Sequence, residues 1–234
     1  MICSALLKNP LLMSNWFNLI LATIVALLPI TNPVSTAALF MSITGDRTPE
    51  ERRKQAFKAS VYTIGILIVF LITGTLIMEF FGISIPGLRI AGGVMVIRVA
   101  FSMLKAENEE IKPDTKEEAI EKSDVSFTPL AMPSLSGPGA IAVTIGLAAG
   151  TDRWTDFTAI ILGIVLTVLA AFLTLRASDK ILKFFGATGV NALSKIMGFL
   201  LLCVGIQFLI DGITDIVVAE GFLQRLIENV QKIA

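Results

Sequence analysis

The chain has 234 residues, of which 54% are hydrophobic and only 16% charged, and its 19 basic and 19 acidic side chains cancel. A mean hydropathy of +0.79 and several apolar runs of roughly 20 residues exclude a soluble domain and predict a polytopic membrane protein. The chain has no histidine and no basic face for nucleic acid, which excludes His-based catalysis and histidine metal sites.

Hydropathy predicts six membrane spans and an all-α membrane protein. The spans are expected at residues 16–43, 59–79, 85–104, 127–149, 156–176 and 191–214. Residues 1–15 form an N-terminal extension with a single lysine, Lys8, and no small-residue cleavage site before Trp16, so no cleaved signal peptide is expected. Cys3 and Cys203 lie too far apart in the sequence to indicate a disulfide framework or a metal site.

The first span contains Pro29 and Pro33, four residues apart near its middle. Each proline removes a backbone donor and clashes with the carbonyl four residues back, so an unbroken helix is not expected. Asn32-Pro33 is typical of a new helix start, with Asn as the N-cap and Pro at the first helical position. A helix over the whole run would be roughly 42 Å long, which puts the break near the bilayer centre.

Positive charge predicts the orientation. The loop after the first span, 45–58, is basic, and the linker 106–126 is rich in Glu and Lys. If the N-terminus is outside, the inner loops hold twelve basic residues and the outer segments hold four, as the positive-inside rule requires. We therefore expect both termini on the outer side of the membrane. The tail 218–234 has helical apolar spacing and is expected to be an amphipathic surface helix.

The two halves of the chain repeat. Pro33 recurs as Pro138, Phe80-Phe81-Gly82 as Phe184-Phe185-Gly186, and Arg89-Ile90-Ala91-Gly92 as Lys195-Ile196-Met197-Gly198, at offsets of 104 to 106 residues. Each unit crosses the membrane three times, which is an odd number. The second copy, 127–217, must therefore enter the membrane inverted relative to the first, 16–105. The sequence therefore predicts an inverted-topology repeat with its first and fourth helices broken, as in many secondary transporters.

The two breaks are the predicted substrate site. Each begins a half-helix whose free N–H groups and positive dipole end suit an anionic group such as a carboxylate. The residues expected to bind it are Thr31, Asn32, Pro33, Ser35, Thr36, Ser134, Ser136, Gly137, Pro138 and Gly139. The alternative is that proline and glycine only kink two helices for packing, in which case the centre of the protein would be dry.

Three charged residues in or near the spans are candidates for coupling or gating. Arg89 and Lys195 occupy equivalent repeat positions and are expected near opposite membrane faces. Asp211, which follows Gln207, is the candidate for coupling to a proton or sodium ion, with an interfacial role as the alternative. Several glycines are expected to allow close helix packing: Gly65, Gly74, Gly163, Gly198 and Gly205.

No set of residues indicates an enzyme. The sequence has no pair of deep carboxylates, no Gly-x-Ser-x-Gly elbow and no phosphate-binding loop. We expect no enzymatic activity, no cofactor and no metal. The expected partners are a small zwitterionic substrate, the lipid bilayer and a coupling ion, with a homo-oligomer as a further option for the amphipathic tail.

Several motifs resemble the MarC family of bacterial inner-membrane proteins. They are Asn32-Pro33, the run from Phe81-Gly82 to Gly92-Gly93, Pro129-Leu130-Ala131-Met132-Pro133 with Gly137-Pro138-Gly139, and Met197-Gly198 with Gly205-Ile206-Gln207-Phe208. The resemblance covers about 16–217. It implies a bacterial inner-membrane protein, and related archaeal members are described as transporters of small neutral amino acids such as glycine and alanine. We therefore expect a secondary transporter of this type; the alternatives are an exporter of other small metabolites or drugs, or a structural membrane protein.

Overall fold

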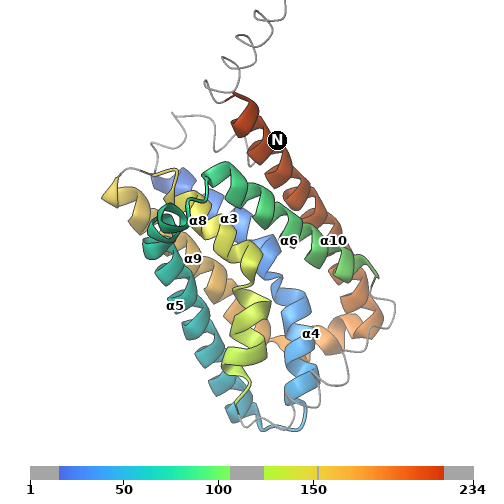
Figure 1. Ribbon diagram of the computed structural model, residues 1–234. Helices are drawn as coiled ribbons and strands as arrows, with labels where there is room; N and C mark the ends of the chain where they lie inside the picture. Colours follow the sequence, from blue (N-terminus) through green and yellow to red (C-terminus); the bar gives the residue numbers. More distant parts are fainter. Residues whose placement is uncertain (1–15, 106–123, 152, 219–234) are drawn as a thin grey trace, which may run out of the picture.

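The computed structural model describes residues 16–105, 124–151 and 153–218 of the chain. The N-terminal extension, most of the charged linker and the C-terminal tail lie outside the described residues, as does residue 152. The described part is helical and contains no strand. Its elements are α3 (Trp16–Thr31), α4 (Pro33–Thr44), α5 (Pro49–Phe81), α6 (Ile85–Lys105), η1 (Ser126–Leu135), α8 (Pro138–Ala148), α9 (Trp154–Arg176) and α10 (Ser178–Val218) (Figure 1).

The helices are long and apolar enough to cross a membrane. Five described helical segments meet this requirement by length and composition, and a sixth is added if η1 and α8, which are bent by 61° relative to each other, form one broken span. These segments coincide with the six apolar runs in the sequence. The all-helical membrane architecture is therefore confirmed.

The first predicted break is confirmed. α3 ends at Thr31 and α4 begins at Pro33, with Asn32 between them as the N-cap. Asn32 has φ 36° and ψ 69°, in the left-handed region that asparagine tolerates better than most residues. Pro29, in contrast, is accommodated inside the last turn of α3.

The second predicted break is also confirmed, and it is wider than the first. η1 is a π-helix with Pro129 and Pro133 inside it, and Thr128 and Met132 have non-helical backbone angles. α8 then begins at Pro138, with Gly137 as an extended N-cap residue that makes no side-chain capping bond.

The prediction of a loop over 45–58 was wrong for most of its length. α5 begins at Pro49 because Thr48 and Glu51 form a capping box, in which each side chain bonds the backbone N–H of the other residue. The polar start of α5 therefore projects as helix beyond its apolar part. At the other end of α5, Gly82 has φ 65°, and its repeat counterpart Gly186 has φ 62° inside α10. Only glycine adopts these angles readily.

α6 and α10 lie side by side and antiparallel along much of their length (Figure 1). Small residues form their seam: a methyl group added at Gly205 would lie 3.0 Å from the Gly93 carbonyl oxygen, and one at Gly212 would lie 2.9 Å from the Pro86 carbonyl oxygen. Close backbone approach of this kind is how helices pack in lipid. Gly198 packs against Met103 and Ala100 in the same way, so the predicted packing role of Gly198 and Gly205 is confirmed.

The space around an added methyl group also distinguishes the other predicted packing glycines from one another. Gly74 lies against Ile145 and Gly163 against Thr23, with no room for a methyl group. Gly65 has nothing within 4 Å of an added methyl group, so its predicted packing role was wrong. It lies on an exposed part of α5.

Candidate functional site

The polar groups at the first break bond mainly within the protein. The hydroxyl of Thr31 donates to the Leu28 carbonyl at 3.1 Å, and that of Thr36 donates to the Thr31 carbonyl at 3.3 Å. Asn32 accepts a bond from the Ser35 N–H at 3.4 Å and donates to the Ser35 hydroxyl at 2.7 Å. The N-terminus of α4 is therefore capped by its own chain. Pro33, the first residue of α4, is buried.

Two bonds join this break to the third helix of each half. The Asn32 amide donates to the Met103 sulfur in α6 at 3.1 Å, and the Ser35 hydroxyl donates to the Ser194 hydroxyl in α10 at 2.9 Å. Met103 and Ser194 were not predicted as site residues, because only the fold brings them to the break.

At the second break, the hydrogen-bonding side chains come from residues before the start of α8 and not from the start of α8 itself. The hydroxyls of Ser134 and Ser136 donate to the carbonyls of Pro129 and Ala131, at 2.8 and 2.7 Å. Gly137 supplies no capping side chain, and Pro138 is exposed. The start of α8 is therefore the less satisfied of the two half-helix starts.

The two breaks are close to each other, with apolar side chains between them. A methyl group added at Gly139 would lie 3.3 Å from Ile30 in α3 and 2.6 Å from Val96 in α6. Ile30 and Val96 also pack in the same apolar cluster as Leu201. The structure thus brings Gly139 of the second break next to the first break, in a tightly packed contact.

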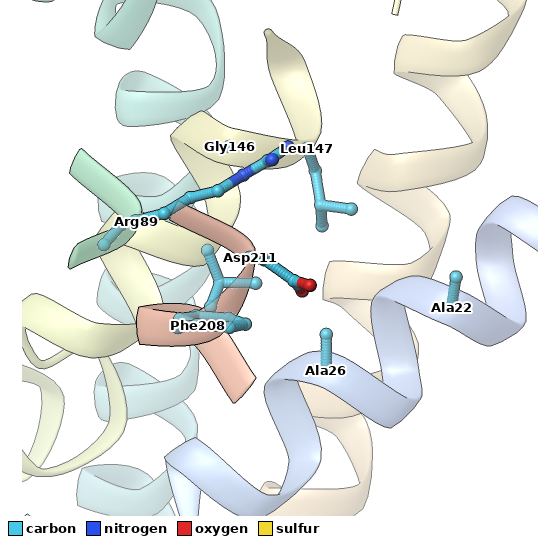
Figure 2. A pocket seen from close by; sticks show the side chains of 9 residues that line it. Ala22, Ala26, Arg89, Gly146, Leu147, Phe208 and Asp211 are labelled. Carbon is cyan, nitrogen blue, oxygen red and sulfur yellow. The ribbon is translucent and has the colours of Figure 1, made fainter. Parts of the chain in front are cut away.

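A cavity of about 50 Å³ lies further along the same two broken helices. Its wall comes from four helices and consists of small or apolar residues and two charged ones: Ala22, Ala26, Arg89, Ala142, Val143, Gly146, Leu147, Phe208 and Asp211. Figure 2 shows the Asp211 carboxylate directed into the space between the α10 residue Phe208 and the α3 residues Ala22 and Ala26. A cavity needs roughly 10–15 Å³ to accommodate one water molecule, so this cavity has room for a few waters or a small solute.

The charged groups of the cavity are fixed by neighbours on α10. Asp211 accepts a hydrogen bond from the Gln207 amide at 2.9 Å, and Arg89 forms an ion pair with Asp215. Among the site predictions, Arg89 and Asp211 therefore meet at one cavity. Lys195 lies at the other end of the α6–α10 pair, next to Ser194.

The wall thus carries one cation, Arg89, which is already paired with Asp215, and one anion, Asp211, among otherwise small or apolar residues. Gly146 helps to form the wall, and a methyl group there would meet nothing within 4 Å. Gly146 could not be identified from the sequence, because a glycine that leaves space looks the same there as one that allows packing.

The chain matches known proteins over most of its length. The model of the MarC family, described as integral membrane proteins, matches residues 17–217. The inner membrane protein MarC of Escherichia coli strain K12 is 41% identical over 206 residues, which cover 83% of this chain and 93% of that protein. The MarC protein of strain UTI89 gives the same values. No solved structure matches. With this match along all the described helices, the chain belongs to the MarC family of integral membrane proteins.

Proposed function

We propose that the protein is a secondary transporter that moves small neutral amino acids of the glycine and alanine type across the inner membrane by alternating access. The observation that carries the proposal is the cavity between α3, α6, α8 and α10, where Arg89 and Asp211 present opposite charges. A zwitterion needs a cation for its carboxylate and an anion for its ammonium group, and both must be held where water is scarce.

Packing between the halves supports an inverted repeat. α4 begins at Pro33 and α8 at Pro138, and α5 begins at Pro49 and α9 at Trp154, so both pairs are 105 residues apart. The contacts are reciprocal: α3 packs on α9 as η1 packs on α5, and α4 packs on α10 as α8 packs on α6. An axis between the halves would make the two broken spans equivalent, with each break serving as the joint at which access alternates.

The helix breaks have a second role in the proposal. The uncapped start of α8, at Gly137 and Pro138, would receive the substrate carboxylate when it moves inward from the cavity. The hydroxyl and amide groups of the first break would exchange their internal bonds for bonds to the substrate. Asp211 would bind the ammonium group or the coupling ion, a proton or sodium.

Location and orientation belong to the same proposal. The MarC relatives are named as inner membrane proteins, and the basic start of α5 is the expected cytoplasmic end. Both termini would then be periplasmic.

The test is solute counterflow in proteoliposomes preloaded in turn with glycine, alanine, serine, a hydrophobic cation and a sugar. Uptake of labelled glycine or alanine is expected only with the matching amino acids inside. Exchange of the hydrophobic cation instead would favour drug export. If the folded protein exchanged none of these solutes, a structural role would be favoured.

Two glycine variants connect transport to the cavity. Gly146→Leu should fill the cavity and abolish counterflow, because the space beside Gly146 is open. Gly65→Leu is the matched control: it adds the same side chain at a second open position, away from the cavity. Equal transport by the two variants would remove the cavity from the mechanism.

Asn32→Asp tests the break separately. Aspartate tolerates the backbone angles at this position and keeps the capping oxygen, but it loses the amide donor. At the second break, Gly137→Leu would be less informative, because even a methyl group there would lie 2.8 Å from the Pro133 carbonyl oxygen and the backbone would have to move.

A further inference from the structure

A second, larger cavity lies beyond the first break, and arginines dominate its charge. Its volume is about 240 Å³. It is lined by the start of α5, the end of α9, the start of α10 and one residue of α4: Phe40, Pro49, Arg52, Arg53, Ala56, Leu175, Arg176, Ser178 and Asp179. Three arginines face one aspartate, so the lining carries a net positive charge.

Arg52 is the buried member of this set. Its side chain is only 15% exposed, and its Nη1 donates to Asp179 at 2.8 Å and to the Met41 sulfur at 3.2 Å. Its Nε is buried and has no hydrogen-bond partner in the described part of the protein. A guanidinium has five N–H donors and no acceptor, so an acceptor such as an oxyanion oxygen is the partner that the Arg52 Nε lacks.

Arg53 and Arg176 add charge that is not neutralised locally. Both are exposed, and neither forms an ion pair with any residue within 16–105, 124–151 or 153–218. Ser178, the first residue of α10, also lines the cavity and places the positive end of that helix there. The arginines come from two different helices, so one ligand would be held from both sides.

We propose that this cavity binds a phosphate group. Phosphate offers several acceptor oxygens and one to two negative charges, which match the excess of arginine over aspartate, and the planar guanidinium fork suits its oxygens. The cavity is at the polar end of the spans, so two sources have the same chemistry: the headgroup of an anionic lipid, or a phosphate dissolved in water. This site is separate from the Arg89 cavity and does not depend on transport.

The variant for the test is Arg53→Gln with Arg176→Gln in the full chain. Both side chains are exposed, so folding should be retained, and Arg52 stays paired with Asp179. The matched control is Lys54→Gln with Lys183→Gln, which removes the same charge from exposed positions of α5 and α10 that do not line the cavity.

The first arm measures binding of inorganic phosphate to delipidated protein in neutral detergent by calorimetry. The second arm measures retention of cardiolipin and phosphatidylglycerol against phosphatidylcholine by native mass spectrometry. Loss of two arginines should weaken binding by about tenfold or more in the arm that reports the natural source, while the lysine control binds like wild type.

Saturable phosphate binding that the arginine variant alone loses would identify a soluble ligand. Selective retention of anionic lipid that the same variant loses would identify a headgroup. The proposal is overturned if neither probe binds wild-type protein, if all three proteins bind alike, or if the lysine control loses as much as the arginine variant.

Discussion

Arg89, in the first turns of α6, forms an ion pair with Asp215 near the end of α10, 126 positions later in the chain. The two side chains are each 31% exposed, so the pair is neither a screened surface contact nor a fully buried one. It joins the ends of the two helices whose glycine seam holds the halves together. It also holds the Arg89 guanidinium beside the cavity that contains Asp211.

Exchanging the two charges should separate the structural role of this pair from its role at the cavity. Asp215→Asn should lower stability by about 1 kcal/mol, because Arg89 loses its partner. The double variant R89D/D215R should recover most of that loss in thermal unfolding in detergent. It should still fail to exchange amino acids, since a second carboxylate then stands beside Asp211. A double variant as unstable as Asp215→Asn would show that the pair is not what holds these helix ends.

The close approach of α6 and α10 at Gly93, Gly205 and Gly212 predicts that one added side chain would lower the stability strongly. In Gly205→Val the new Cβ would lie 2.6 Å from Ile97 and 3.0 Å from the Gly93 carbonyl oxygen. The α6 backbone would have to move, at a cost of about 1–3 kcal/mol in unfolding free energy. Gly65→Val, at an open position of α5, is the comparison and should change stability little. Equal stabilities would mean that the seam is loose.

The hydrogen bonds of Asp124, at the start of the second half, predict that the stability of the protein depends on pH. Hydrogen bonds from Lys58 first, and from Ser126 second, lower the pKa of this carboxyl from its ordinary value of 3.8 to about 2. Because the folded pKa is the lower one, the stabilisation is complete above about pH 4 and is lost as the pH falls toward 2. Wild type should therefore be more stable than Asp124→Asn at neutral pH, and the difference should shrink between pH 4 and 2. A difference that does not change with pH would refute the linkage.

The proposed orientation can be read by chemical labelling. In a background with Cys3 and Cys203 replaced by serine, a single cysteine at Asp46, in the connection between α4 and α5, should react with a membrane-impermeant maleimide only after the cytoplasmic side is opened. A cysteine at Thr155, at the start of α9, should react in intact spheroplasts. Both side chains are exposed and lie at the ends of the spans, so the side of the membrane should decide their access to the reagent. The reverse pattern would invert the topology.

The helix breaks could be predicted from the sequence because their causes are local. Proline removes a donor wherever it stands, and asparagine before proline is a strong cap, so Asn32-Pro33 needed no tertiary information. The start of α5 also has a local cause, the Thr48-Pro49-x-Glu51 capping signal, but the basic residues around it are equally typical of a cytoplasmic loop.

The partners of the charged residues could not be predicted in the same way. In the sequence, Asp215 and Asp179 only lie near the ends of apolar runs, and it is the fold that gives them Arg89 and Arg52 as partners. The hydroxyls at the breaks looked available for a ligand, but Thr36 and Ser136 bond carbonyls of their own chain. Serine and threonine do this often in helices, and sequence alone does not say where.

The interruption between α9 and α10 at Ala177 has no equivalent in α5, which continues unbroken from Pro49 to Phe81. In the proposed repeat, one half thus contains an unbroken helix where the other contains an interrupted one, and Arg176, Ser178 and Asp179 of the arginine-lined cavity flank that interruption. Under the proposed transport cycle, two identical inverted halves would make the inward-open and outward-open forms equivalent by two-fold rotation and equal in free energy. Unequal halves would remove that equivalence, so such a transporter should favour one side of the membrane even without a gradient.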